Sequence, residues 1–584
     1  MNKGAPDISR EPRLLFFYLV FLLLVGVLTV GRIGISWDEP NYFGSSYLYL
    51  SWFGNIFENP SEWWSSIDRF WEQSHEAPPF FKLWALPFAG LGVLFFGTEN
   101  LEAVGDFYRM ASYALFLISI HVAFRFVRDE FGAAAAWGTA VSMPLIPVLF
   151  GFARLGQLDG AAAAMYAISA VLLFRLMHGE GKRRILWTGL VVGMAFATKL
   201  TVFPVVLAAV LWAAVFRRER GVFARLFASF GVGAVAFFGI WPWLWREPIP
   251  RTLDFLTWTS GLQNERLTYY LGEWWAGAPF HYPLAALIVF VPLVVAAAGV
   301  FGAARLLKKV GNSAPAWLLI NLALVLAVAG SGLTPVYGGP RQFLAAFPLW
   351  AMCAGIGFAW VLARLRMSRF RINLAAALAV YAALALPGII WTGTENSLEY
   401  YGEAVGLAPG ANALGFETTY LANTYESAVE WVNENAPENS TVYVQAGTYP
   451  VAESYSRTGG MRDDLRPAYL APIAVETFTS DEEPREDSYF LFLPRQSIYT
   501  DQMLALEGME PLFEDEKGGV PLVKVYSGEQ VGETLDVEGR PEARDVGIVN
   551  ASVVGLGILA LFSTILRRKK EEDEEREEDE IPHG

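Results

Sequence analysis

The chain has 584 residues, 54% of them hydrophobic, and a net charge of −15. This composition excludes a protein built only of soluble domains and favours one that crosses a bilayer many times. The single cysteine, Cys353, excludes a disulfide within the chain and leaves no basis for a thiolate metal site. Acids are concentrated near the C-terminus: residues 394–545 hold 29 acids against 9 bases and residues 571–580 hold 9 against 1, so the remainder carries a net charge of +13.

Apolar segments long enough to cross a bilayer recur along the chain, beginning with Leu14–Val30. No small-residue cleavage signal follows this first segment, so we expect it to remain as an anchor. Lys and Arg cluster in every second connection, which is typical of cytoplasmic loops. This alternation predicts about twelve spans in the cell (plasma) membrane, with both chain ends in the cytoplasm. The apolar segment Pro79–Gly97 would invert the alternation if it crossed the bilayer, so we expect it to lie at the outer interface.

Residues 394–545 lack long apolar runs and indicate a compact α/β unit on the outer side. Tyr425–Asn435 has the apolar spacing of a helix, with Val429 and Val432 on one face, and Pro437 follows it. Three later segments have the composition of strands, namely Thr441–Gln445, Tyr489–Leu493 and Leu522–Tyr526.

The sequence therefore predicts a mainly α-helical polytopic membrane protein with an extracytoplasmic α/β domain. The predicted parts are 1–393, a membrane domain whose outer loop 33–105 carries interfacial helices; 394–545, the soluble α/β domain; 546–566, a C-terminal transmembrane helix; and 567–584, an acidic cytoplasmic tail expected to be disordered.

Two adjacent acids, Asp38 and Glu39, follow Trp37 at the start of the first outer connection. One interpretation is that they only mark the hydrated end of a span. The same connection is rich in tryptophan and proline, however, which indicates a folded layer on the lipid headgroups. A carboxylate that is partly desolvated there can have the raised proton affinity that a general base needs. Both acids are therefore candidate catalytic residues.

Further candidates lie at the predicted outer ends of other spans. Asp159 is a candidate second acid, although its place before Gly160 and an alanine-rich run would equally suit a helix N-cap. Lys199, Arg341 and Lys82 are candidate cations for binding a phosphate, and the alternative for each is a snorkelling anchor. A guanidinium such as that of Arg341 can bind a phosphate at two points.

Other motifs are uninformative or missing. The connection Trp241–Tyr282 is rich in tryptophan, which suits an interface belt better than stacking on sugar rings. No Walker loop, Rossmann fingerprint or HExxH string occurs, so a nucleotide-driven pump has no visible motor. We expect no cofactor; a divalent ion held by Asp38, Glu39 and Asp159 is the alternative.

Several motifs, taken in order, resemble the dolichyl-phosphate-mannose protein mannosyltransferase and lipid A aminoarabinose transferase group, multispanning glycosyltransferases of the GT-C class. The resemblance covers roughly residues 13–392. Its motifs are Trp37-Asp38-Glu39, His75-Glu76-Ala77-Pro78-Pro79 followed by Gly97 and Arg109, Gln157-Leu158-Asp159, and Thr198-Lys199. The second resembles the family's H-x-P-P segment leading to an arginine, although two residues separate His75 from Pro78. His75 and Arg109 become site candidates through this resemblance alone.

The resemblance implies a polyprenyl-phosphate sugar as donor, an extracytoplasmic protein, lipid or glycan as acceptor, and inversion at the anomeric carbon. Asp38 would be the base, Glu39 would assist it, and Lys199 or Arg341 would lie near the phosphate. The expected partners are the donor, the acceptor and the bilayer, and not nucleic acid. One alternative is a polytopic transporter or flippase of lipid-linked sugars, which would carry ionisable residues at mid-membrane depth. Another is a sugar-polymer ligase or polymerase that shares the donor.

Overall fold

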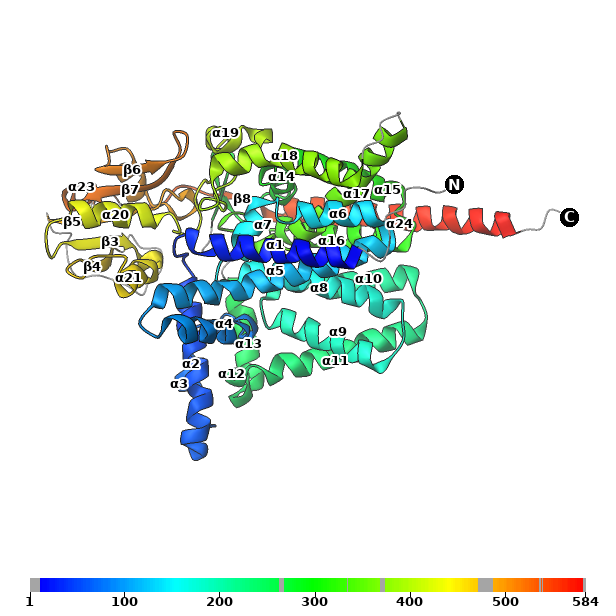
Figure 1. Ribbon diagram of the computed structural model, residues 1–584, viewed down its shortest axis with the longest axis horizontal. Coiled ribbons are helices and arrows are strands. Elements are labelled where there is room, and N and C mark those ends of the chain that lie inside the picture. The colour runs from blue at the N-terminus through cyan, green and yellow to red at the C-terminus, as the bar shows by residue number, and fades with distance from the viewer. Residues whose placement is uncertain are drawn as a thin grey trace.

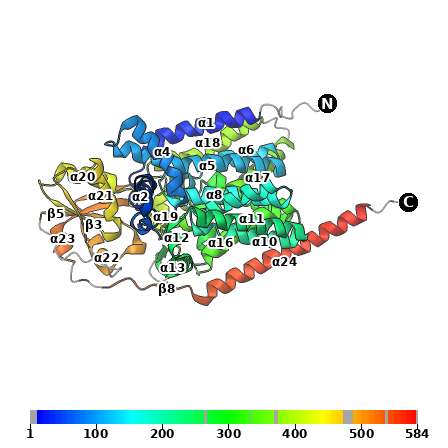
Figure 2. The same cartoon turned by 90° about the horizontal axis from the view of Figure 1, so that it is seen from below.

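The computed structural model describes residues 11–261, 267–332, 334–367, 373–470, 487–534, 537 and 539–580. Figure 1 shows a long helical bundle with a sheet-containing unit at one end. In both views, the start of α1 (Glu11–Thr29) and the end of α24 (Gly547–Glu580) lie at the opposite end of the bundle (Figures 1 and 2). The first and last helices therefore begin and end on the same side, as an even number of crossings would give.

Eight helices of the described chain are long and apolar enough to cross a membrane. A bent pair, α6 (Ala133–Ser142) and α7 (Pro147–Ala153), adds a ninth span if its two helices, inclined at 68°, cross together. The eight are α1 with its 3-10 extension Val30–Arg32, α5 (Leu101–Phe131), α8 (Leu158–Met177), α11 (Arg220–Gly239), α16 (Ser313–Gly330), α17 (Ala346–Met367), α18 (Leu374–Thr392) and α24. The chain is thus a multi-pass membrane protein.

Three of the twelve predicted spans are short or interrupted helices in the structure. They correspond to α9 (Lys182–Phe196), to α10 (Pro204–Phe216) with the preceding 3-10 turn Leu200–Val202, and to the pair α14 (Tyr282–Val289) and α15 (Leu293–Lys308). A helix needs roughly 20 apolar residues to cross the hydrocarbon. α9 begins instead with three bases, and Pro292 separates α14 from α15. The count of twelve therefore stays a prediction.

Close helix packing in the bundle depends on small residues. α15 and α17 approach so closely that a Cβ built at Gly302 would lie 1.8 Å from the carbonyl oxygen of Cys353. A Cβ built at Gly357 would likewise lie 1.9 Å from the carbonyl oxygen of Ala298. In lipid, helices associate largely through such van der Waals contact, because the surrounding tails are as apolar as the side chains. These two positions therefore require glycine.

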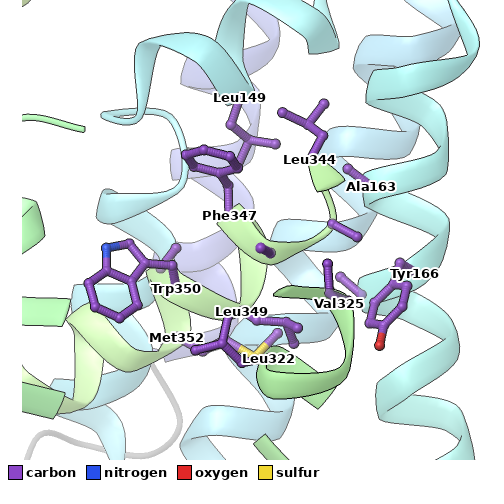
Figure 3. Packing of buried hydrophobic residues seen from close by; sticks show 14 of the residues in the cluster. Leu149, Ala163, Tyr166, Leu322, Val325, Leu344, Phe347, Leu349, Trp350 and Met352 are labelled. Carbon is purple, nitrogen blue, oxygen red and sulfur yellow. The ribbon is translucent and has the colours of Figure 1, made fainter. Parts of the chain in front are cut away.

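Larger side chains fill the bundle core between α8, α16 and α17 (Figure 3). Tyr166, Val325 and Phe347 are buried there. The Tyr166 hydroxyl donates a hydrogen bond to Asn321 Oδ1 at 3.0 Å, so this buried polar group is satisfied. Two of these helices lead directly into the candidate site, since α8 begins beside Asp159 and α17 follows the turn that holds Arg341.

The connection between α1 and α5 folds into α2 (Glu39–Glu58), the 3-10 turn Pro60–Glu62, α3 (Ile67–Trp71) and α4 (Phe80–Phe96), and α2 runs across the direction of the spans (Figure 1). The rings of Tyr49 and Trp71 stack with centroids 3.9 Å apart. Trp241 and Trp243 belong to the connection after α11, which contains α12 (Pro242–Arg246) and α13 (Pro248–Gly261), and they are buried in the same cluster. The belt interpretation is therefore wrong for these two tryptophans, because they form the core of a layer joining both connections.

The unit beyond α18 contains a five-stranded sheet with strand order β4-β3-β5-β7-β6. β3 pairs in parallel with β4 and β5, whereas β7 pairs antiparallel with β5 and β6. Alternate residues supply two cores, one under α20 and α21 and one under α22 and α23. The bounds are β3 Thr441–Gln445, β4 Arg466–Leu470, β5 Ser488–Phe492, β6 Phe513–Glu516, β7 Pro521–Ser527, α19 Leu407–Ala413, α20 Tyr425–Asn435, α21 Tyr449–Thr458, α22 Asp501–Glu507 and α23 Gly528–Gly532. The predicted helix is confirmed, and the three predicted strands are confirmed to within one residue.

The chain returns to the bundle through a small second sheet and then α24. β8 (Arg544–Asp545) pairs with β2 (Glu273–Ala276), which pairs with β1 (Thr268–Tyr270). The predicted tail, expected to be disordered, continues α24 as a helix to Glu580, and residues 581–584 lie outside the described residues. Four bases precede the acids of the tail. Ion pairs between residues one turn apart, such as Lys570 and Glu574 at 3.5 Å, stabilise the helix. The prediction of disorder considered only the block of like charge and not these ion pairs.

Candidate functional site

Four of the predicted site residues come from four separate connections. Asp38 precedes α2, and Asp159 lies in the first turn of α8. Lys199 precedes the 3-10 turn Leu200–Val202, and Arg341 lies in η5, the 3-10 turn Gly339–Phe343. Each residue is therefore at the end of a helix or in a turn, where the rigid bundle fixes the backbone.

These four side chains form one continuous chain of ion pairs. Arg341 Nη2 lies 2.5 Å from Asp38 Oδ2 and 3.3 Å from Asp159 Oδ2. The other carboxylate oxygen of Asp159 accepts a hydrogen bond from Lys199 Nζ. Asp159 is buried, whereas the side chains of Asp38 and Lys199 are 22% and 19% exposed. The structure thus brings together two acids and two cations that the sequence separates by up to 303 positions.

The electrostatics favour the charged form of Arg341. Burial alone would lower the pKa of Arg341, but Asp159 and Asp38 raise it well above its ordinary value. The four charges sum to zero, so an incoming anion would compete with the two carboxylates for the cations. Asp159, which contacts both cations, is placed to hold them side by side.

Glu39 and Arg109 form a different pair behind this chain. Arg109 Nε donates to Glu39 Oε1 at 2.7 Å and Nη2 donates to Oε2 at 2.8 Å. Glu39 also accepts from the backbone N–H groups of Ser36 (2.9 Å) and Gly156 (2.6 Å). Burial alone would raise the pKa of Glu39, but Arg109 and these hydrogen bonds hold it below its ordinary value. Both residues are buried, and neither lines the cavity described below.

Lys82 and His75 lie away from the ion-pair chain. Lys82 is fully buried on the face of α4 that meets α2, where its Nζ donates to the Ser74 carbonyl oxygen at 2.9 Å and lies 5.1 Å from the ring centre of Tyr49. Burial lowers the pKa of Lys82 to about 7, which suits a structural contact better than a phosphate clamp. The His75 ring stacks on Trp243 with centroids 4.6 Å apart.

A cavity of about 560 Å³ lies beside the ion pairs. Asp38, Lys199 and Arg341 form part of its wall. Another part of the wall is apolar and comes from α10, α13, α16 and the turn before α10; it includes Leu200, Phe203, Pro204, Phe255, Leu256, Val325 and Val328. Phe203 and Leu256 are 47% and 43% exposed, so the apolar part reaches the bundle surface. The cavity therefore suits a molecule with an anionic head and an apolar tail.

Several residues of the cavity wall were not among the predicted site residues, including Tyr42, Glu76, Tyr337 and Arg495. Glu76 lies inside the motif around His75, and Tyr337 lies four positions before Arg341. Arg495 follows β5 in the α/β unit, far from every motif. The sequence feature that could have drawn attention to Arg495 is composition, because it is one of only 9 bases among residues 394–545.

The predicted alternative of a divalent ion required three carboxylates in one place. Asp38 and Asp159 both contact Arg341, whereas Glu39 contacts Arg109. Over the ranges that the structure describes, no group of three or more His, Cys, Asp or Glu side chains is arranged to hold a metal ion. The residues present therefore do not form the proposed ligand set.

Comparison with known families identifies one region of the chain. A family model described as dolichyl-phosphate-mannose-protein mannosyltransferase matches residues 87–245. This stretch contains Arg109, Asp159 and Lys199, and it confirms the predicted resemblance to glycosyltransferases of the GT-C class. No curated protein sequence matches the chain.

Two solved structures show what the whole chain is similar to. ArnT from Cupriavidus metallidurans, in a crystal structure bound to undecaprenyl phosphate, is 16% identical with a TM-score of 0.48, and the match covers 90% of this chain and 99% of that one. The Archaeoglobus fulgidus oligosaccharyltransferase, tethered with an acceptor peptide, is 12% identical with a TM-score of 0.41, and the match covers 77% of this chain and 64% of that one.

Proposed function

We propose that the chain is a membrane glycosyltransferase that moves a sugar from a polyprenyl-phosphate donor to an acceptor on the outer side of the membrane, with inversion at the anomeric carbon. The observation that carries the proposal is the cavity, whose wall combines Asp38, Lys199 and Arg341 with apolar residues that reach the bundle surface. The family match over residues 87–245 supports the reaction class.

The two parts of the cavity suit the two parts of such a donor. The apolar wall, including Phe203 and Leu256, would contact the polyprenyl chain, because burial of apolar surface is the main favourable term in binding it. The phosphate would bind Lys199 and Arg341, since charge-assisted hydrogen bonds to a phosphate are among the strongest in proteins. The sugar would then lie beside Asp38.

The ion pairs suggest how donor binding prepares the base. The Asp38 carboxylate is held by Arg341 at 2.5 Å, so the cation competes for the oxygen that would receive the acceptor's proton. A phosphate that takes over part of the Arg341 guanidinium would weaken this pair. Asp38 would then accept the proton of the acceptor hydroxyl or amine as that atom attacks the anomeric carbon.

The bond from the anomeric carbon to the phosphate oxygen breaks in the same step. The leaving polyprenyl phosphate gains negative charge, and Lys199 and Arg341 stabilise it in place. Asp159 contacts both cations and does not line the cavity, so we assign it to orienting them rather than to proton transfer. Glu39 and Arg109 are assigned to fixing the start of α2, which Asp38 precedes.

The sidedness of this site follows from charge. Bases flank the bundle end that holds the start of α1, whereas the acidic unit 394–545 lies at the other end (Figure 1). By the positive-inside rule, both chain ends would be cytoplasmic and the α/β unit and the site extracytoplasmic. This orientation agrees with a donor held in the membrane and an acceptor that arrives from water.

Replacing Arg341 with Lys should weaken the binding of polyprenyl phosphate about tenfold or more. The variant keeps the charge but loses the planar guanidinium, and hydrogen bonds to charged groups contribute ~1.5–3 kcal/mol. Binding of polyprenyl phosphate to purified protein would be measured by displacement of a fluorescent lipid phosphate. Arg251→Lys is the matched control, because Arg251, in α13, pairs with the carboxylate of Asp68 in α3 and does not line the cavity. Equal affinities for the two variants would contradict the assignment of Arg341.

A further inference from the structure

The segment that leads into Asp38 is fixed by the α/β unit. Trp37 donates its backbone N–H to the carbonyl oxygen of Leu421 at 2.8 Å. Its indole lies against the backbone of Gly447, where a built Cβ would be 2.1 Å from the ring. Two positions earlier, the backbone N–H of Ile35 donates to the Tyr455 hydroxyl at 3.1 Å. The start of α2 is therefore fixed from outside the helical bundle.

The turn that carries Arg341 contacts the same unit. Gly339 has a φ of 64°, and a Cβ built there would lie 2.9 Å from the ring of Tyr420. The preceding Gly338 has a φ of 65°, and a Cβ built there would lie 3.6 Å from Arg495 Nη2. Both loops of the Asp38–Arg341 pair therefore pack on the α/β unit.

Arg495 lies beside both loops. Its guanidinium carbon lies 5.2 Å from the ring centre of Trp37, within the range of a cation–π interaction. Its Nη1 donates to the Tyr420 carbonyl oxygen at 2.9 Å, and its Nε donates to Ser497 Oγ at 3.2 Å. The residue is 4% exposed, and it lines the cavity.

The fold holds Arg495 rigidly. It lies three residues after β5, the central strand of the five-stranded sheet. The Gln445 side chain both accepts from the N–H of Leu493 and donates to its carbonyl oxygen, each at 3.2 Å. Thr419 Oγ1 donates to the Pro494 carbonyl oxygen at 3.0 Å. The position of the guanidinium is thus set by the sheet rather than by a free loop.

We propose that Arg495 is a positioning residue through which the α/β unit sets the geometry of Asp38 and Arg341, so that sugar transfer requires this unit to be seated on the bundle. The inference rests on the proposed function and gives the unit a part in the reaction beyond shielding the site. Arg495 acts through Trp37 and the Gly338–Arg341 turn. A misplacement of about 1 Å at reacting groups can reduce a rate about 100-fold.

Arg495→Gln is expected to lower the kcat of sugar transfer about 10- to 100-fold, with a smaller change in the KM for the donor. Arg495→Lys keeps the charge over Trp37 and should recover part of the loss. In a Trp37→Leu background, Arg495→Gln should cost much less than in the wild type, since the ring contact is already gone. Arg462→Gln is the control, because Arg462 is also hydrogen-bonded within the same unit, to Asp464 and Asn433, but does not line the cavity.

Hydrogen exchange of residues 34–38 separates this inference from the proposed function. Arg495→Gln should speed exchange there, whereas Arg462→Gln should not, whether or not any transfer is detected. If the wild type releases no lipid phosphate from any polyprenyl-phosphate sugar, the proposed function fails while the exchange result still stands. Unchanged exchange together with unchanged kcat in Arg495→Gln would overturn the inference, as would equal losses in Arg495→Gln and Arg462→Gln.

Discussion

Asp38→Asn is expected to leave the protein folded and inserted while lowering sugar transfer from a polyprenyl-phosphate donor by roughly 10²- to 10⁴-fold, the usual range for loss of a general base. The amide keeps the size of the side chain but cannot accept the acceptor's proton. Release of polyprenyl phosphate by purified protein is the measurement. Donor affinity should hold or rise. Arg341 would lose the carboxylate of Asp38, which lies 2.5 Å from it and competes with the donor phosphate.

Asp68→Asn is the control for this experiment. Asp68 lies in the same connection, between α1 and α5, and also pairs with arginines, Arg246 at 3.1 Å and Arg251 at 2.8 Å, but it does not line the cavity. It should keep near-normal turnover. Undiminished turnover in Asp38→Asn would remove Asp38 from the reaction, and an equal loss in both variants would indicate a general effect on the outer layer.

Arg109→Met is expected to lower the free energy of unfolding by about 3–5 kcal/mol, the cost of leaving one partner of a buried ion pair alone. Glu39 would keep its burial but lose two charged hydrogen bonds, and the carbonyl oxygens of Val30, Ile33 and Gly34 would each lose a donor. Removing both charges in Glu39→Gln/Arg109→Met should recover part of the loss. Unfolding would be followed in detergent, with Arg457→Met as control, because its pair with Glu453 is exposed and should contribute at most about 1 kcal/mol.

The pH dependence of the free energy of unfolding provides a second check of the Glu39–Arg109 pair. The pKa of Glu39 is held below its ordinary value, so its folded form binds fewer protons than its unfolded form. The stabilisation is therefore complete above the ordinary glutamate pKa and is lost as the pH falls through the lowered value. The wild type should lose stability in that acidic window more steeply than the double variant. Parallel curves, or a stable Arg109→Met protein, would contradict a structural role for the pair.

The sequence predicted the parts of this site that lie at the ends of apolar segments. Asp38, Asp159, Lys199 and Arg341 each interrupt or follow such a segment, and a charge at that depth is costly unless it is paired or functional. The clustering of Lys and Arg in every second connection predicted that these four residues lie on one side of the membrane. The family match over residues 87–245 includes two of the four, Asp159 and Lys199.

The sequence did not predict which neighbours the side chains of the two long connections contact. Lys82 could have faced the cavity or α2, and only the packing of α4 on α2 decides between them. Trp241 and Trp243 could not be assigned to a buried cluster, because their partners come from a connection about 170 residues away. Arg495 was beyond reach for the same reason, since its neighbours Trp37 and Gly338 are distant in sequence.

The most direct test of the central claim is the position of a polyprenyl phosphate bound to the purified protein, determined by cryo-electron microscopy. The phosphate should lie within hydrogen-bond distance of Lys199 and Arg341, with its chain along Phe203 and Leu256. A lipid phosphate bound elsewhere, with Asp38 and Arg341 still paired and the cavity empty, would contradict it.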